Sequence, residues 1–398
     1  MQDRFVITPP DWLVRGPAAR ILALLAGARA VGGAVRDTLA GLAVADIDLA
    51  TTLSPEAVAA RLGEAGIRVV PTGIAHGTVT AVLDGAPIEI TTLRRDLETD
   101  GRHAVVAFDA DWREDAARRD FTINAMSLAP DGTVFDYFGG QPDLAAGRVR
   151  FVGEAPMRIA EDYLRALRWF RFQARYGRGA PDPAALAAIE AAAPALRRLS
   201  AERVWSELKR ILEAPDPRAV LGLMEAAGVA RVVLPEGTDL AALDRLVAAG
   251  APAEPLLRLS VLLAPGADLD RFARRLRLSG EEAARLAALR AGPAPVPEND
   301  EAALRRLLAE FPAGLLAGRS WRAQPGRPDP AWQALRARIA AMAVPVFPLR
   351  AADLGLPEGP RVGRALAAMR AAWLAGGCVA DRASLAAEAQ RLIASGLL

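Results

Sequence analysis

The segment Val31–Ala50, VGGAVRDTLAGLAVADIDLA, constrains the fold of this chain more than any other. Two adjacent glycines follow a short apolar run, and an Asp-x-Asp, Asp46 and Asp48, comes about a dozen residues later. Because glycine lets backbone N–H groups approach a phosphate closely, Gly32 and Gly33 are candidate phosphate-binding residues. Residues i and i+2 of a strand share a face, so we expect the two carboxylates to lie side by side, where divalent cations relieve their repulsion. Such a pairing of phosphate cradle and metal site indicates phosphoryl or nucleotidyl transfer.

Composition excludes several classes of site. The 398 residues carry a formal net charge of +2, and Lys209 is the only lysine among many arginines, so charge alone is weak evidence for a nucleic-acid partner. One cysteine, Cys378, and two histidines exclude a disulfide framework and a cysteine- or histidine-rich metal centre. The sequence has no apolar leader and no run of about 18 apolar residues, so we expect a cytoplasmic protein without a membrane span. This length accommodates two to four domains.

The hydrophobic pattern changes near residue 150. Before it, we expect a helix over Leu13–Ala26, strands at Ala28–Val31 and Ile47–Leu49, and a hairpin turn at Asp84 and Gly85. After it, long Ala/Leu/Arg segments with helical spacing alternate with loops that contain proline and glycine. The pattern predicts an α+β fold, with a small mixed head followed by a long helical body.

Further charged residues belong to the candidate site. Arg36 can grip a triphosphate with two hydrogen bonds, and Asp37 is expected to be a structural cap or ion-pair partner. Glu89 alternates with isoleucines along a strand and is either a third carboxylate near the metals or an ordinary exposed residue. In RRDFTINAM, Arg119 either binds a triphosphate or is surface charge. Asp120 in the same motif either accepts a hydrogen bond from a ribose hydroxyl or caps the segment.

The segment Glu161–Phe172, EDYLRALRWFRF, is expected to form one helix. Every third residue from Asp162 onward is charged, which places a polar ridge along it: Asp162, Arg165, Arg168 and Arg171. Either the ridge reads a nucleotide base, or its acidic start and basic end suit the helix dipole. A carboxylate accepts from an exocyclic amine, and a guanidinium donates to a ring nitrogen or carbonyl. Asp162 beside Arg165 would therefore select cytosine and adenine and reject uracil and guanine.

Five ordered motifs resemble one family. They are GGAVRD with DID, HGTVTAVLDGAPIEITTLR, DGRHAVVAF, RRDFTINAM and EDYLRALRWFRF, spread over about residues 30–210. Together they resemble the class II tRNA nucleotidyltransferases and bacterial poly(A) polymerases. The resemblance implies a polymerase-β-like nucleotidyltransferase head at residues 1–150, followed by a helical neck at 151–230, a helical body at 231–340 and a helical tail at 341–398. The tail is expected to bind tRNA.

The resemblance also assigns roles. It implies that Asp46 and Asp48 ligate Mg²⁺, with Glu89 as a further active-site carboxylate, and that Asp162 and Arg165 read the base. The candidate nucleotide-binding residues, from the resemblance and the local patterns together, are Gly32, Gly33, Arg36, Arg119, Asp120, Asp162, Arg165, Arg168 and Arg171. It relates residues 92–118 to a flexible loop and Ser200–Leu208 to a helix that supports the nucleotide pocket.

The sequence therefore favours a template-independent enzyme that adds CCA from CTP and ATP to the 3′ end of tRNA with two Mg²⁺ ions. EDYLRALR resembles the CCA-adding members most. Poly(A) polymerases and enzymes that add only CC or only A are the closest alternatives. A non-catalytic RNA-binding protein on the same scaffold is the alternative from another class, and clustered carboxylates near a phosphate cradle argue against it. A dinucleotide-binding oxidoreductase would need a glycine-rich fingerprint that is missing. The oligomeric state is left open.

Overall fold

The computed structural model describes residues 3–74, 77–99, 104–107 and 110–395. Their contacts divide the chain into two compact units, an N-terminal unit of Met1–Pro235 and a C-terminal unit of Glu236–Leu398. The N-terminal unit combines a sheet with helices and the C-terminal unit is helical over its described residues, which confirms the predicted α+β class. The finer division into head, neck, body and tail at residues 150, 230 and 340 stays a prediction.

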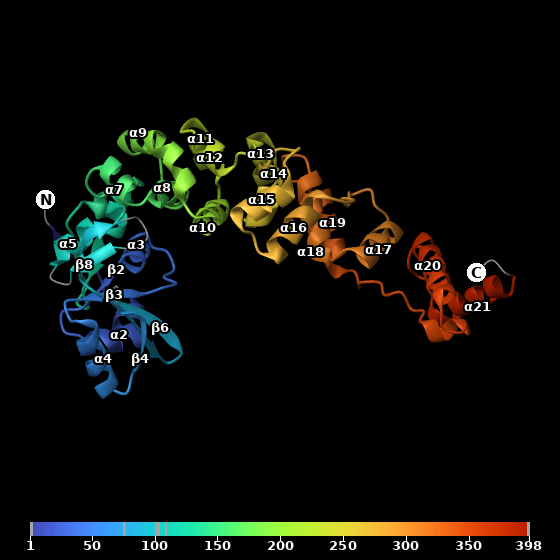
Figure 1. Ribbon diagram of the computed structural model, residues 1–398, viewed down its shortest axis with the longest axis horizontal. Helices are drawn as coiled ribbons and strands as arrows, with labels where there is room; N and C mark the ends of the chain where they lie inside the picture. The colour runs from blue at the N-terminus through green and yellow to red at the C-terminus, as the bar shows by residue number, and fades with distance from the viewer. Residues whose placement is uncertain (1–2, 75–76, 100–103, 108–109, 396–398) are drawn as a thin grey trace. The chain divides into compact units, whose positions relative to one another are not determined.

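Eight strands of the described part of the N-terminal unit form one mixed sheet, in the order β1-β10-β9-β2-β3-β6-β5-β4 (Figure 1). They are β1 (Arg4–Val6), β2 (Arg29–Val31), β3 (Asp48–Thr51), β4 (Arg68–Gly73), β5 (Thr78–Leu83), β6 (Ala86–Thr92), β9 (Met126–Leu128) and β10 (Thr133–Asp136), while β7 (Arg95–Thr99) pairs with β8 (Ala104–Ala107). Strands β3 and β6 are parallel and in register, so Asp48 lies opposite Glu89 in the middle of the sheet. The hairpin turn at Asp84 and Gly85 is confirmed, with both residues at positive φ.

The helices of the N-terminal unit surround this sheet and continue beyond it. They are α1 (Asp11–Val14), α2 (Pro17–Leu24), α3 (Gly33–Leu39), α4 (Pro55–Glu64), α5 (Trp112–Ala117), η2 (Thr122–Asn124), α6 (Gly140–Ala146), α7 (Ala155–Glu161), α8 (Leu164–Tyr176), α9 (Pro183–Ala192), η3 (Ala193–Arg198), α10 (Ala201–Leu212), α11 (Arg218–Ala226) and α12 (Val229–Val233). The single helix expected over Leu13–Ala26 was wrong, because the chain breaks at Gly16, whose φ is +86°. Pro17 then opens α2, at the one helical position that tolerates its missing N–H.

Helix α8 is anchored by an aromatic core. Trp169 and Phe170 are fully buried, and the indole of Trp169 donates a 2.8 Å hydrogen bond to the carbonyl of Val149. The ring of Phe121, which directly precedes η2, lies 5.1 Å from that of Phe172 on α8. These contacts fix α8 against the segment around η2, so charged side chains on the remaining face of α8 have defined positions.

The C-terminal unit is built from helices. They are α13 (Leu240–Ala248), α14 (Pro255–Leu262), α15 (Leu269–Leu276), α16 (Gly280–Arg290), α17 (Glu301–Glu310), α18 (Ala313–Ala323), α19 (Pro330–Ala341), η4 (Ala351–Leu354), α20 (Pro360–Ala375) and α21 (Arg382–Ala394). Prolines mark the loops as predicted, with Pro255 opening α14 and the run 293–297 separating α16 from α17. In the part of the chain that the structure describes, no helix combines the length and the apolar character needed to cross a bilayer.

Candidate functional site

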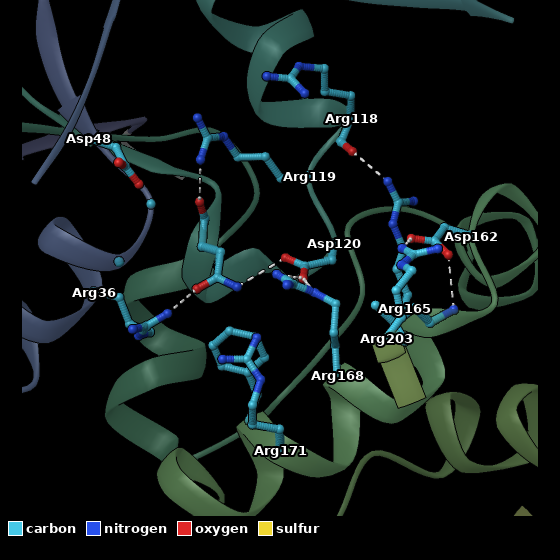
Figure 2. A pocket seen from close by; sticks show the side chains of 15 residues that line it. Arg36, Asp48, Arg118, Arg119, Asp120, Asp162, Arg165, Arg168, Arg171 and Arg203 are labelled. Carbon is cyan, nitrogen blue, oxygen red and sulfur yellow. Dashed lines mark hydrogen bonds and ion pairs between the residues drawn. The ribbon is translucent and has the colours of Figure 1, made fainter. Parts of the chain in front are cut away.

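A cavity of about 460 Å³ in the N-terminal unit gathers most of the predicted site residues (Figure 2). Its lining residues are Gly32, Gly33, Arg36, Asp48, Arg118, Arg119, Asp120, Asn124, Asp162, Leu164, Arg165, Arg168, Arg171, Phe172 and Arg203. Seven arginines against three aspartates make the lining strongly positive, so the cavity suits a polyanion. Of the residues predicted from the sequence, Asp46 and Glu89 do not belong to this lining.

The glycine turn lies between β2 and α3, at the edge of the cavity. Gly32 has φ +66° and ψ −124°, a conformation that strains any residue with a side chain. A Cβ at Gly32 would also lie 3.1 Å from Nη1 of Arg119, so the turn and that arginine are in close contact. The backbone conformation therefore favours glycine here, and a side chain would also displace the end of Arg119 slightly.

Arg36 is held rigidly on α3. Its Nε and Nη2 each lie 3.0 Å from a different oxygen of Asp37, and its Nη1 donates a 2.6 Å hydrogen bond to the side-chain oxygen of Asn124. Asp37 is thus the ion-pair partner that was expected. The rings of Tyr176 and Phe172 lie 4.5 and 5.1 Å from the guanidinium carbon, within cation–π range. Arg36 reaches the cavity with little freedom to move.

The carboxylates form a partial cluster. Partial desolvation raises the pKa of Asp48, and the neighbouring Glu89 and Asp46 raise it further while Arg119 opposes the rise. The strand argument for Asp46 was wrong, because β3 begins only at Asp48 and Asp46 precedes it in irregular chain. Over the described residues, no three or more His, Cys, Asp or Glu side chains are grouped as a ready-made metal site. A cation here would take its other ligands from water and phosphate, which is common for Mg²⁺.

Two of the cavity arginines form ion pairs with the same buried carboxylate. Asp115 on α5 is 3% exposed, and its carboxylate lies 2.8 Å from Nη2 of Arg118 and 3.2 Å from Nη2 of Arg119. Burial alone would raise the pKa of Asp115, but the two guanidinium groups hold it below its ordinary value. Sequence reasoning missed Asp115, although its spacing of three and four residues from the arginines on a short helix is a usable signal.

Asp120 is occupied by protein donors. It is 7% exposed and accepts hydrogen bonds from the N–H of Phe121 at 2.9 Å, from the amide of Asn124 at 3.0 Å and from Nε of Arg168 at 2.7 Å. Burial opposes ionisation, yet these donors, led by Arg168, lower the pKa of Asp120. Asp120 thus holds this segment and Arg168 together without capping η2, and contact with a ribose stays a prediction.

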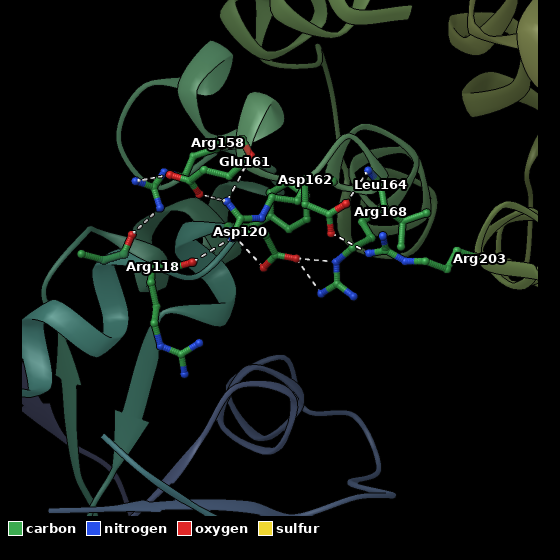
Figure 3. A network of polar contacts seen from close by, with 11 residues as sticks. Arg118, Asp120, Arg158, Glu161, Asp162, Leu164, Arg168 and Arg203 are labelled. Carbon is green, nitrogen blue, oxygen red and sulfur yellow. Dashed lines mark hydrogen bonds and ion pairs between the residues drawn. The ribbon is translucent and has the colours of Figure 1, made fainter. Parts of the chain in front are cut away.

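The expected single helix over Glu161–Phe172 was wrong. Helix α7 ends at Glu161, Asp162 is extended with φ −154°, and α8 begins at Leu164 (Figure 3). One oxygen of Asp162 accepts the N–H of Leu164 at 3.0 Å, and the other lies 2.6 Å from Nη2 of Arg203 on α10. A short acidic side chain that bonds to nearby backbone competes with helix formation, which explains the break.

The predicted base-reading pair therefore has two separate sets of partners in this structure. Arg165 binds the carboxylate of Glu161 and the carbonyls of Arg158 and Arg118, at 3.1 and 3.0 Å, whereas Asp162 binds Arg203. Figure 2 shows Asp162, Arg165 and Arg203 on the side of the cavity away from Asp48. Both members of the pair nevertheless line the same cavity.

Helix α10 contributes two residues that the sequence did not identify. Besides Arg203, it carries Glu207, which is 4% exposed and lies 2.7 Å from Nε of Arg171. Burial lowers the pKa of Arg171, and Glu207 opposes this. The segment Ser200–Leu208 was expected to support the pocket. It contacts two of the lining residues, Asp162 through Arg203 and Arg171 through Glu207.

Comparison with known proteins agrees with this geometry. A family model described as the poly A polymerase head domain matches residues 28–150, and one described as a probable RNA and SrmB-binding site of polymerase A matches residues 180–240. The CCA tRNA nucleotidyltransferase 1, mitochondrial, of Danio rerio is 44% identical over 260 residues, which are 64% of this chain and 60% of the relative. The human protein of the same name is 45% identical over 263 residues, with the same coverage. The match thus spans about three fifths of the length of these curated relatives.

Solved structures extend the likeness over nearly the whole chain. The Bacillus stearothermophilus CCA-adding enzyme in complex with CTP is 27% identical, with a TM-score of 0.76 over 98% of this chain and 99% of that one. A Thermotoga maritima CCA-adding enzyme complexed with tRNA has a TM-score of 0.67 at 20% identity, over 99% of this chain and all of that one, and shows the fold alone. The polymerase-β-like head followed by helices, expected from the motifs, is confirmed. The chain is therefore similar to CCA-adding enzymes, in sequence over 64% of its length and in fold over nearly all of it, and its residues 28–150 match the head domain described for poly A polymerase.

Proposed function

We propose that the protein adds C, C and A to the 3′ end of tRNA, with CTP and ATP as donors and without a nucleic-acid template. The observation that carries the proposal is that one arginine-rich cavity joins the glycine turn, Asp48 and the pair of Asp162 and Arg165. The relatives named CCA tRNA nucleotidyltransferase and CCA-adding enzyme support the same assignment.

We assign the metal site to Asp46 and Asp48, with Glu89 beside them. The raised pKa of Asp48 supports this assignment, because crowded carboxylates gain most from a divalent cation that replaces a proton. Mg²⁺ in this place would activate the attacking hydroxyl and neutralise charge on the leaving pyrophosphate. The protein's own part is to hold Asp48 in the lining of the proposed triphosphate site, with Asp46 and Glu89 close enough to raise its pKa.

The positive residues around the glycine turn would hold the triphosphate. In the transfer step, the terminal hydroxyl of tRNA loses its proton and its oxygen forms a bond to the α-phosphorus of CTP or ATP. The bond from that phosphorus to pyrophosphate breaks, and pyrophosphate leaves. Arg36 and Arg119 lie beside the turn, where their guanidinium groups can each bind phosphate oxygens in pairs.

Base selection would fall to Asp162 and Arg165. Cytosine and adenine both place an exocyclic amine beside a ring nitrogen, which matches a carboxylate next to a guanidinium. Each residue now has a protein partner, Arg203 for Asp162 and Glu161 for Arg165, so the base would have to compete with these contacts or share the residue with them. Both side chains are therefore held by protein contacts before a nucleotide enters.

The direct test uses tRNA that lacks its 3′ CCA, each nucleotide in turn and sequencing of the products. We expect CTP alone to add two C residues, ATP to add A only after them, and UTP and GTP to be rejected. Long A tails with ATP alone would indicate a poly(A) polymerase instead. No incorporation with any nucleotide in Mg²⁺ would favour the non-catalytic RNA-binding alternative.

The cytoplasmic location expected from the sequence is also a proposal, since three of the matched relatives are named as mitochondrial proteins. Fractionation of the source cells would test it.

A further inference from the structure

Helix α8 lines the cavity from Leu164 to Phe172, and its last residue contacts a neighbour of the cavity residue Arg36. Arg165 in its first turn belongs to the proposed base-reading pair, and Tyr176 is its last residue, about 16 Å further along the axis. The hydroxyl of Tyr176 donates a 2.6 Å hydrogen bond to Oδ1 of Asp37. That same oxygen also accepts from Nε of Arg36 at 3.0 Å. One helix thus reaches the side chains proposed to read the base and the side chains proposed to hold the triphosphate.

This hydrogen bond is largely buried. The side chains of Arg36 and Asp37 are 11% and 13% exposed, and Tyr176 is buried. The ring of Tyr176 also lies under the guanidinium of Arg36 and is stacked on Phe172, with ring centroids 5.9 Å apart. Burial, together with the bond to Asp37, raises the pKa of Tyr176 to about 12 against the opposing charge of Arg36. The hydroxyl therefore remains a donor at neutral and mildly alkaline pH.

Without the hydroxyl, the Asp37 side chain would lose a hydrogen bond that it makes in addition to its ion pair with Arg36. Asp37 is the bidentate partner of Arg36, and the remaining guanidinium contact is to Asn124. If Arg36 has to be immobilised when phosphate binds, the lost conformational entropy lowers the affinity for phosphate. If Arg36 is already fixed, this cost is avoided. The hydroxyl of Tyr176 is therefore placed to affect phosphate binding at a distance, through Asp37.

We propose that Tyr176 is a positioning residue for the triphosphate, acting through Asp37 to hold Arg36 in its binding conformation. The inference rests on the proposed function, in which this cavity binds CTP and ATP. It assigns to α8 a second task beside base reading, and it names Asp37 as the link.

The test begins with Tyr176→Phe, which keeps the ring beneath Arg36 and removes only the hydroxyl. We expect KM for CTP and for ATP to rise about threefold to tenfold with kcat within about twofold, because binding common to substrate and transition state is lost. The matched control is Tyr137→Phe, whose hydroxyl accepts a 3.4 Å hydrogen bond from Arg29 and which is not part of the cavity lining. KM should not change in that variant.

Inorganic tripolyphosphate has neither base nor sugar, so its binding reports on the triphosphate contacts alone and not on base reading by Arg165. Its Kd, measured by calorimetry on the whole chain, should rise in Tyr176→Phe by the same factor as KM. In the Asp37→Ala background, Tyr176→Phe should have no further effect on this Kd, because the side chain that links Tyr176 to Arg36 is already absent. Equal tripolyphosphate affinity in wild type and Tyr176→Phe, or additive effects of the two substitutions, would overturn the inference.

The two proposals fail separately. A wild-type chain that binds tripolyphosphate but incorporates neither CTP nor ATP would refute the proposed function, while the calorimetric comparison would still decide the role of Tyr176.

Discussion

Asp120→Asn is the perturbation whose effect on stability the structure defines best. The buried carboxylate binds Arg168 through two nitrogens, at 2.7 and 2.6 Å. Both nitrogens bind the same oxygen, Oδ2, while Oδ1 accepts from Phe121 and Asn124. In the variant, the amide nitrogen therefore faces donors in either orientation, and the negative charge is lost. Removing one partner of a buried pair costs about 3–5 kcal/mol, and the side chain of Arg168 is 32% exposed, so water offsets part of it. We expect a loss of about 2–4 kcal/mol.

Differential scanning calorimetry measures this directly. A loss of that size lowers the Tm of a unit of about 235 residues by about 5–15 °C. Adding Arg168→Gln to Asp120→Asn should recover part of the lost Tm, because the two neutral amide side chains can pair with each other. Asp131→Asn is the control, because Asp131 is exposed and bonds only locally to Thr133, and its transition should not move. A wild-type Tm in Asp120→Asn, or a double variant less stable than the single one, would refute the reasoning.

The same residue predicts a pH dependence. The pKa of Asp120 is lower in the folded chain than its ordinary value, which is near 3.9 in unfolded chains. Its stabilising effect is therefore complete above the unfolded value and is lost as the pH falls through the folded value. The difference in Tm between wild type and Asp120→Asn should shrink below about pH 4.

Three further predictions concern the site. Asp115→Asn should raise KM for CTP about tenfold, because it releases Arg118 and Arg119. The control is Asp143→Asn, at an equally buried aspartate paired with Arg148 and Arg150, which should lower Tm and leave KM unchanged. Equal effects on KM in the two variants would contradict this. Arg165→Ala should reduce the preference for CTP over UTP about 5- to 150-fold, the worth of one bidentate base contact, and an unchanged preference in competition assays would exclude Arg165 from base reading. Glu89 raises the pKa of Asp48, so Glu89→Gln should lower that pKa. The acid limb of the pH profile of kcat/KM should then move to lower pH at saturating Mg²⁺. An acid limb that does not move would mean that it does not report the titration of Asp48.

Much of the site was predictable because its signals are local. The glycine turn, Arg36 and the arginines before Asp120 are each encoded within a few residues, and all of them line one cavity. The alternation that placed Glu89 on the polar face of its strand also held, since Ile88 and Ile90 are buried and Glu89 is exposed. Periodicity was sufficient for the α+β class and for the helical C-terminal unit.

The remainder depended on contacts distant in sequence. Arg203 binds Asp162 across 41 positions, and Asn124 binds Arg36 across 88, so no local pattern reveals either. The break at Asp162 was missed because helical periodicity takes no account of a carboxylate that bonds to the N–H of Leu164. The turn at Gly16 was missed because the apolar pattern of Leu13–Ala26 is helical throughout, although Gly16 and Pro17 interrupt the helix.

The central claim is that Asp48 directly ligates the cation required for transfer. The most direct measurement is CMP incorporation into tRNA lacking CCA by Asp48→Cys, with Mg²⁺ and then with Cd²⁺, beside the wild type. A thiolate binds soft metals and is a poor ligand for Mg²⁺, so the variant should be inactive in Mg²⁺ and regain activity in Cd²⁺. Wild-type activity of the variant in Mg²⁺, or a folded variant that Cd²⁺ does not restore, would contradict the account.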